Sequence, residues 1–135
     1  MLTVVAALIE SDGKILVCQR RRSTSFGLMW EFPGGKVEPR EMPEHALQRE
    51  LREELDIEIR IGPEVYRTTY RYSEMAQTIA LIFFAARIIR GQLKNLNFEQ
   101  VQWQAPESLS ELDFLPADRE LIDRLAAGLL SLPRF

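Results

Sequence analysis

The chain has 135 residues, of which 46% are hydrophobic and 27% charged, and its formal net charge is −3. This length fits one domain with one sizeable core, so we expect residues 1–135 to form a single domain. The acidic balance argues against an electrostatic grip on duplex nucleic acid, which needs a clustered basic face. It still permits a small anionic substrate if a cation is bound locally.

The single cysteine and the single histidine limit the kinds of site that the chain can build. One cysteine excludes an internal disulfide and fits a reducing compartment. Because Cys18 lies in the apolar run KILVCQR, we expect a buried strand thiol rather than a nucleophile. His45 has no second histidine or cysteine with which to form a zinc site.

The first residues lack the features of a signal peptide, and no apolar run reaches the roughly 20 residues of a membrane span. We therefore expect a cytoplasmic protein with no membrane partner, either a monomer or a homodimer.

The first 55 residues predict two strands, a loop and a helix. Residues 3–10 (TVVAALIE) and 14–20 (KILVCQR) read as strands joined by a glycine-containing turn. Residues 21–33 read as a loop that ends in an aromatic-rich strand. Residues 43–55 (PEHALQRELREEL) have helical spacing, with Pro43 at a favoured first position.

The remaining residues predict mainly strands, with helices near the end. We expect a short strand at 58–62, longer strands at 63–73 and 76–89, and another strand at 98–104. The strand at 76–89 is apolar enough to be buried on both faces. A short helix is expected at 106–112 and a C-terminal helix at 116–132, whose apolar stripe is Leu121, Ile122, Leu125 and Leu129. This order predicts an α+β fold with a mixed sheet between helices.

The predicted helix 43–55 carries two of its glutamates in an unusual place. On a helical wheel the apolar stripe is Leu47, Leu51 and Leu55, and the opposite, solvated face is His45, Gln48 and Arg52. Glu53 lies near the solvated face, but Glu50 lies at the edge of the leucine stripe and Glu54 lies between Glu50 and Leu47. A carboxyl group that leans toward the core must be protonated, paired or metal-bound.

Two interpretations of these glutamates stay open at this point. In one, Arg49 and Arg52 pair with them on an ordinary ion-paired helix. In the other, they bind Mg²⁺ or Mn²⁺, which takes oxygen ligands and commonly joins protein carboxylates to substrate phosphates. Gly34 and Gly35 precede the helix and permit backbone to approach a ligand closely, although two glycines also suit a simple tight turn.

Residues 35–57 resemble the Nudix box, G-x5-E-x7-R-E-U-x-E-E-x-G-U, in which U is aliphatic. The matching residues are Gly35, Glu41, Arg49, Glu50, Leu51, Glu53, Glu54 and Ile57, with Asp56 in place of the last glycine. Outside the box, LVCQR, WEFPGGKVEP and FLPADRELIDRL resemble the MutT-like branch, which includes 8-oxo-dGTP diphosphatases and CTP pyrophosphohydrolases.

The resemblance implies an α/β/α sandwich and Mg²⁺- or Mn²⁺-dependent cleavage of nucleoside diphosphates linked to a further group X. Within that class it points to a (d)NTP pyrophosphohydrolase that releases NMP and pyrophosphate from an 8-oxo-dGTP- or CTP-like substrate. The alternatives are a Nudix hydrolase for ADP-ribose, an NDP-sugar or capped RNA, and a non-catalytic nucleotide-binding module.

The resemblance also implies roles for the residues of the box. Glu50, Glu53 and Glu54 would be metal ligands, together with the carbonyl of Gly34. Arg49 would orient these glutamates, and Glu41 would support it. Either Glu53 or Glu50 would be the base that orients the attacking water.

Substrate contacts are expected from several segments. Gly35 and Lys36 are expected to contact the substrate because they begin the Nudix-like segment. Arg20 stands at the position where relatives use an arginine to hold substrate phosphates, although it also suits an exposed loop. Asp118 aligns with the residue that reads the base in MutT-like proteins, and it is also a good N-cap for the last helix. Phe83 is a candidate for base stacking, with core packing as its alternative.

The sequence departs from the family pattern at three places. Relatives often carry a further metal-binding glutamate six residues before the tryptophan that matches Trp103; here that position is Asn97, and the nearest acid is Glu99. Either Glu99 substitutes, or the site holds metal with fewer carboxylates. Asp56 replaces a glycine just past the helix, and Met42 lacks the side-chain oxygen that an N-cap prefers, worth about 1 kcal/mol.

Overall fold

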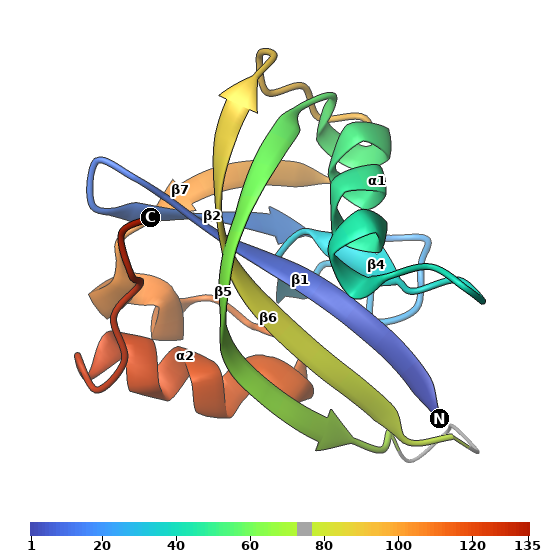
Figure 1. Ribbon diagram of the computed structural model, residues 1–135. Helices are drawn as coiled ribbons and strands as arrows, with labels where there is room; N and C mark the ends of the chain where they lie inside the picture. The colour runs from blue at the N-terminus through green and yellow to red at the C-terminus, as the bar shows by residue number, and fades with distance from the viewer. Residues whose placement is uncertain (73–76) are drawn as a thin grey trace.

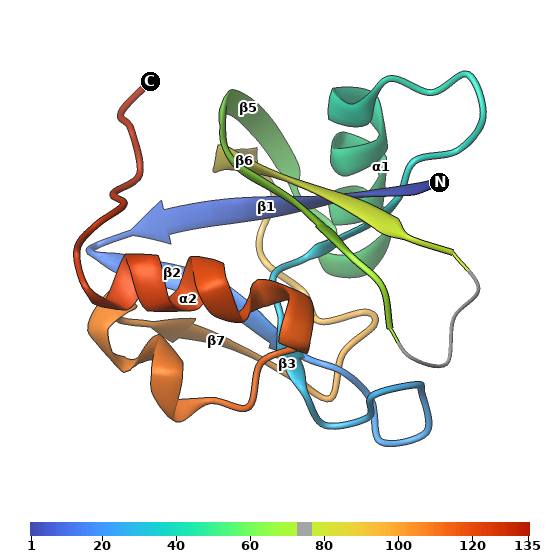
Figure 2. The same cartoon turned by 90° about the horizontal axis from the view of Figure 1, so that it is seen from below.

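The computed structural model describes residues 1–72 and 77–135, and in these residues seven strands form one mixed sheet with helices on both faces (Figure 1, Figure 2). The strands are β1 (Leu2–Ser11), β2 (Lys14–Gln19), β3 (Trp30–Glu31), β4 (Gly34–Lys36), β5 (Glu58–Tyr70), β6 (Ile79–Arg90) and β7 (Gln100–Gln104). The helices are α1 (Pro43–Leu55), the 3₁₀ turns η1 (Pro106–Glu111) and η2 (Pro116–Asp118), and α2 (Arg119–Ala126).

Strand β1 is the centre of the sheet. It runs parallel to β6 over Leu2–Ile9 and antiparallel to β2 and β4. Strand β5 pairs antiparallel with β6, and β2 pairs antiparallel with β3 and β7. The sheet is therefore mixed, as the sequence predicts.

The two faces of β1 support two separate halves of the core. On one face Val5, Ala7 and Ile9 pack with the buried leucines of α1, namely Leu47, Leu51 and Leu55. On the other face Ala6 and Leu8 pack with the buried residues of α2, namely Leu121, Ile122 and Leu125. This alternation follows from the two-residue period of a strand, and it confirms the α/β/α sandwich. Cys18 is fully buried in the α1 half of the core, which agrees with a strand thiol rather than a nucleophile.

Two predicted strands form a single strand in the structure. The strands expected at 58–62 and 63–73 are one strand, β5, because register shifts around Ile61, Glu64 and Tyr66 absorb the Gly62–Pro63 step. Residue 73 and the first residue of the strand expected at 76–89 lie outside the described residues.

The C-terminal helix is shorter than the sequence predicts. Helix α2 ends at Ala126, and Gly128 follows with φ +73°, a left-handed conformation that terminates helices. The backbone N–H of Leu129 then bonds to the carbonyl of Arg124. Leu129 is 80% exposed, so its expected place on the apolar stripe is wrong. Among the described residues no helix is long and apolar enough to cross a membrane.

Helix α1 has the expected limits and the expected weak caps. Met42 makes no side-chain cap bond, and Asp56 closes the helix in a left-handed conformation with φ 57° and ψ 38°. The N–H of Asp56 donates to the carbonyl of Arg52 at 3.1 Å, so the left-handed conformation satisfies a carbonyl at the end of the helix. The cost is steric, because in this conformation the Cβ of Asp56 lies close to the following carbonyl oxygen.

Replacing Asp56 with glycine should raise the free energy of unfolding by about 1 kcal/mol, because glycine takes the left-handed conformation without that cost. The substitution also removes an exposed ion pair with Lys94 at 3.9 Å, which contributes little. Urea denaturation measures the change. His45→Gly, at an exposed position in the first turn of the same helix, is the control and should lower stability by up to about 1 kcal/mol. Equal or lower stability of Asp56→Gly would contradict the assignment of strain to this residue.

Candidate active site

A cavity of about 1110 Å³ lies beside β4 and the inward face of α1. Its polar lining comes from five segments of the chain and comprises Arg20, Ser25, Glu31, Gly34, Gly35, Lys36, Glu38, Glu50, Glu54, Asn97 and Asp118. Its apolar lining includes Leu2, Val4, Phe26, Tyr72, Ile79, Leu81, Phe83 and Leu115. The cavity therefore offers a polar wall next to an apolar one, which suits a ligand with a charged part and a flat apolar part.

The two glycines of β4 form part of a strand rather than a tight turn. Gly34 pairs with Ala6 and Gly35 pairs with Val5 on β1. A Cβ on Gly34 would collide with the backbone of Val5, and a Cβ on Gly35 would lie 2.6 Å from both carboxyl oxygens of Glu50. Glycine is needed here because backbone and a carboxyl group occupy the space that side chains would fill.

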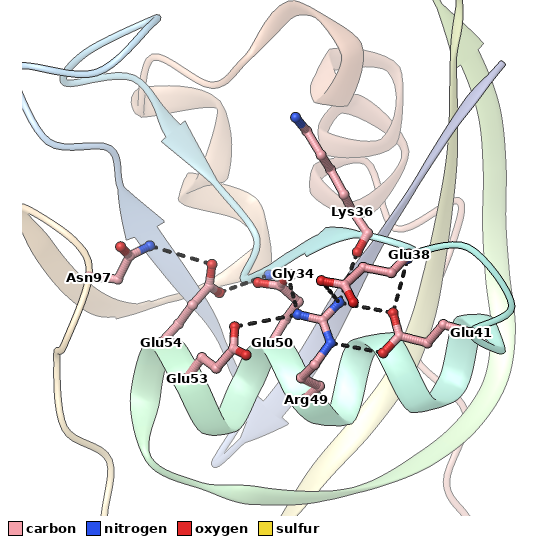
Figure 3. A network of polar contacts seen from close by, with 9 residues as sticks. All are labelled: Gly34, Lys36, Glu38, Glu41, Arg49, Glu50, Glu53, Glu54 and Asn97. Atoms are coloured by element: carbon pink, nitrogen blue, oxygen red, sulfur yellow. Dashed lines mark hydrogen bonds and ion pairs between the residues drawn. The ribbon is translucent and has the colours of Figure 1, made fainter.

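Arg49 is the centre of a network that holds the glutamates (Figure 3). Its Nε and Nη2 donate to the two oxygens of Glu41 at 2.8 and 2.9 Å, and Nη2 also donates to the carbonyl of Lys36 at 3.1 Å. Its Nη1 donates to Glu50 at 3.0 Å and to Glu53 at 3.4 Å. These bonds lower the pKa of Glu41 to about 2 and raise the pKa of Arg49. Arg49 thus contacts Glu41, Glu50 and Glu53 at once, while its orienting role stays a prediction.

Glu54 is held differently, by two neutral donors. Its Oε1 accepts from the N–H of Gly34 at 3.2 Å, and its Oε2 accepts from the side-chain amide of Asn97 at 3.4 Å (Figure 3). Burial, and then the neighbouring Glu50 and Glu31, raise the pKa of Glu54 to about 9. The ionised form of this carboxyl is therefore disfavoured unless a cation comes close.

The orientation expected from the helical wheel is observed for all three glutamates. The side chain of Glu53 is 60% exposed, whereas that of Glu50 is 16% exposed and its pKa is raised mainly by burial. Glu54 is half-buried. Gln48, expected on the solvated face, is also half-buried, and its amide donates to the carbonyl of Ile59 at 3.5 Å.

The donor set suits a hard divalent cation, because Glu50, Glu53 and Glu54 offer only carboxylate oxygens. Within residues 1–72 and 77–135, Glu54 pairs with no cationic side chain. In the part of the chain that the structure describes, no three acidic, histidine or cysteine side chains already converge on a metal-binding point. Arg49 holds Glu50 and Glu53 toward itself, so a cation would have to compete with its guanidinium for them.

Arg20 is engaged inside the cavity wall rather than free in solvent. Its Nη1 lies 3.1 and 3.2 Å from the two oxygens of Glu31, and its Nε donates to the carbonyl of Ser25 at 2.8 Å. Glu31 was not among the residues predicted from the sequence, although strand alternation places it opposite the buried Trp30 and Phe32 and so offers a signal. Burial raises its pKa despite the contact with Arg20.

Asp118 lines the cavity, and its side chain does not cap α2. It stands at the residue before α2, as the sequence predicts, but it is 4% exposed, has helical backbone angles and makes no side-chain cap hydrogen bond. Burial, and then the nearby charge of Glu31, raise its pKa to about 8. Asp118 thus brings a carboxyl group with an elevated proton affinity to the cavity wall.

The remaining predicted residues take different places. Phe83 is 1% exposed and its ring packs edge-on against Phe32 at 6.2 Å, which favours core packing, although it also borders the cavity. The side chain of Lys36 extends away from the carboxyl groups (Figure 3). Glu99 is exposed and accepts from the N–H of Arg22 at 3.5 Å, so the structure brings Asn97 and not Glu99 to Glu54.

An aromatic pair at the cavity was not predicted. The ring centroids of Phe26 and Tyr72 lie 4.9 Å apart, and Tyr70 packs edge-on against Tyr72 at 4.7 Å. Phe26 comes from the loop after β2, with φ 56°, and Tyr72 follows β5. Because Phe26 and Tyr72 lie 46 residues apart in the chain, no local pattern in the sequence joins them.

Asp118→Asn should change how stability depends on pH. The pKa of Asp118 rises from 3.8 to about 8 on folding, so between these values the native state retains a proton that the unfolded state has lost. Ionising the buried Asp118 lowers the free energy of unfolding. This loss of stability is absent below the unfolded pKa, grows as the pH rises through this window, and is complete above about pH 8. The stability of Asp118→Asn relative to the wild type should therefore increase with pH in urea denaturation.

The exposed Asp113, on the same segment, supplies the control. Asp113→Asn removes a carboxyl group from the same segment without touching the cavity and is measured in the same way. A difference between Asp118→Asn and the wild type that stays constant from pH 4 to pH 8 would contradict the raised pKa.

Comparison with known proteins agrees with this geometry. A relative from Escherichia coli (strain K12) described as CTP pyrophosphohydrolase is 39% identical and covers 94% of this chain and 93% of its own. An 8-oxo-dGTP diphosphatase from Haemophilus influenzae is 32% identical and covers 93% of this chain and 91% of its own. The crystal structure of a MutT protein from Methanosarcina mazei Go1 superposes with a TM-score of 0.82 at 22% identity, over 95% of this chain and 94% of that one, and shows the same fold. The NUDIX domain model matches residues 1–125, and the chain belongs to this family of hydrolases.

Proposed function

We propose that this protein is a divalent-metal-dependent nucleoside triphosphate pyrophosphohydrolase that releases a nucleoside monophosphate and pyrophosphate. The observation that carries the proposal is the inward placement of Glu50 and Glu54 beside the glycine strand β4, where burial raises the pKa of both carboxyls. Relatives described as a CTP pyrophosphohydrolase and an 8-oxo-dGTP diphosphatase support a triphosphate substrate of that kind. We propose that residues 1–135 act as one catalytic unit.

The proposed cofactor is Mg²⁺ or Mn²⁺, held by Glu50, Glu53 and Glu54 with the carbonyl of Gly34. When bound, such a cation neutralises pyrophosphate charge, lowers the pKa of a bound water and stabilises the leaving oxygen. The chain contributes the orientation of the carboxylates, because Arg49 fixes Glu50 and the N–H of Gly34 fixes Glu54.

The geometry favours Glu53 over Glu50 as the base. Glu53 is exposed and has a single long bond to Arg49 at 3.4 Å, whereas Glu50 is held at 3.0 Å and packs against Gly35. In the proposed reaction Glu53 accepts a proton as the oxygen of water attacks the β-phosphorus. The bond between that phosphorus and the oxygen bridging to the α-phosphate breaks, and the monophosphate leaves with the bridging oxygen.

The rest of the cavity suits the rest of a nucleotide. We propose that Arg20 contacts the phosphates, with Gly35 and Lys36 bordering them, since all three line the same cavity as the carboxyls. The nucleobase of the substrate would lie on the apolar lining, against the Phe26–Tyr72 pair, with its polar edge at Asp118. Phe83 would contribute only to the packing behind this surface.

A product assay over a substrate panel tests the proposed function, with Mg²⁺ and with normal and oxidised (d)NTPs, ADP-ribose, NDP-sugars, dinucleoside polyphosphates and capped RNA as substrates. At least one triphosphate should yield NMP and pyrophosphate in equal amounts. Products only from the other substrates would contradict a triphosphatase and favour another activity of the family. Nucleotide binding without any product would favour a binding module.

Glu53→Gln should lower kcat for the best substrate by roughly 10²- to 10⁴-fold, because the amide cannot accept the proton. The affinity for the nucleotide, measured by calorimetry at saturating Mg²⁺, should stay within a few fold. Glu44→Gln, at an exposed position of the same helix, is the matched control and should leave both quantities unchanged. A kcat near the wild-type value in Glu53→Gln would assign the base to another residue.

A further inference from the structure

Asn97 contacts the most perturbed carboxyl of the proposed metal site. Its side-chain amide donates to Oε2 of Glu54 at 3.4 Å, while the N–H of Gly34 donates to Oε1 at 3.2 Å (Figure 3). Each carboxylate oxygen has two acceptor positions, so both donors leave room for a further partner on Glu54. Asn97 also lines the cavity itself.

Asn97 is held in this position by its surroundings. Arg21 donates from Nε to the carbonyl of Asn97 at 2.9 Å, and Asn95 accepts from the N–H of Asn97 at 3.3 Å. The same loop is fastened to the end of α1, where the N–H of Leu96 bonds to the carbonyl of Glu54 at 3.0 Å. The amide therefore lies beside Glu54 because backbone contacts on both sides of the loop place it there.

Of the three glutamates in the proposed metal site, two pair with an arginine and one does not. Arg49 pairs with Glu41, Glu50 and Glu53, and in the described residues no lysine, arginine or histidine side chain pairs with Glu54. Asn97 supplies a hydrogen bond to Glu54 but no negative charge. Glu50 and Glu53 are thus already paired with Arg49 when no metal is bound. The loop that carries Asn97 adds no carboxylate to the site.

This balance limits the attraction of the free protein for a divalent cation. The electrostatic attraction grows with the number of nearby unpaired carboxylates. Of Glu50, Glu53 and Glu54, only Glu54 has no cationic side-chain partner in the residues that the structure describes. A triphosphate brings several further negative oxygens to the same cavity. Metal and nucleotide then each strengthen the binding of the other, by the same factor in both directions.

We propose that Asn97 is a positioning residue that holds Glu54 toward the cation without adding charge, so that the metal binds the free protein weakly and binds tightly only together with the nucleotide. This inference rests on the proposed function. It makes Asn97, which takes the place of a carboxylate in this chain, the residue that couples metal binding to substrate binding.

Titration of Mn²⁺ into the full chain without nucleotide, followed by electron paramagnetic resonance, tests the charge at this position. Asn97→Asp keeps the shape of the side chain and adds a carboxylate, so it should tighten Mn²⁺ binding by about tenfold or more. Asn97→Gln retains a neutral amide and should stay within a few fold of the wild type. Thermal unfolding of both variants confirms that they are folded. Equal Mn²⁺ affinities in the wild type and Asn97→Asp would overturn the proposal.

The coupling has its own readout in calorimetry. The α,β-methylene analogues of dCTP and dGTP, which resist cleavage at the proposed bond, should bind more tightly with Mn²⁺ than with EDTA. The gain should be larger for the wild type than for Asn97→Asp, and a gain of the same size in both would overturn the proposal. Pyrophosphate release by the wild type is scored separately. Its absence would contradict the proposed function, whereas its presence with unchanged Mn²⁺ affinity in Asn97→Asp would contradict only the role of Asn97.

Discussion

The close fit between the β4 backbone and the glutamates of α1 is the constraint on which the rest of the site depends. Strand β4 pairs with β1 on one side and faces Glu50 on the other, and it fits there because Gly34 and Gly35 have no side chains. The N–H of Gly34 then becomes a donor to Glu54. The inward glutamates are therefore built against strand backbone, which explains how a helix can direct carboxyl groups toward its buried side without filling the core with charge.

The carboxyl groups of the site outnumber the cationic side chains that pair with them. Arg49 pairs with Glu41, Glu50 and Glu53, and Arg20 pairs with Glu31, yet burial still raises the pKa values of Glu31 and Glu50. Burial raises the pKa further, to about 9, for Glu54 and to about 8 for Asp118. A polyanion would be repelled by such a wall unless a cation accompanied it. Buried carboxyl groups such as those of Glu54 and Asp118 are unfavourable in the free protein. They are consistent with a site to which metal and substrate bind together.

The local part of this arrangement could be predicted from the sequence. The limits of α1 follow from Pro43 and the leucine period, and the wheel alone orients Glu50, Glu53 and Glu54. The merging of two strands into β5 was missed because register shifts accommodate Gly62 and Pro63, residues that usually end strands. The early end of α2 depends on Gly128, whose left-handed conformation overrides the leucine pattern.

The long-range part required the fold. Phe26 meets Tyr72, Arg20 meets Glu31, and Asn97 meets Glu54 only because the sheet brings distant loops to one edge of a cavity. Asp118 shows the same limit, since its sequence fits a helix cap equally well and only its burial beside Glu31 assigns it to the cavity. Periodicity indicates which way a side chain points from its own element, but not what it meets there.

Pyrophosphate release by Gly35→Ala tests the central claim most directly. The added Cβ would meet the carboxyl group of Glu50, the mobile end of a side chain, so the strand should fold while Glu50 is displaced. A displacement of about 1 Å in a catalytic group costs roughly 10²-fold in rate. We therefore predict a loss of that size in kcat, in a protein whose thermal unfolding is close to that of the wild type. A wild-type kcat in folded Gly35→Ala would contradict the account.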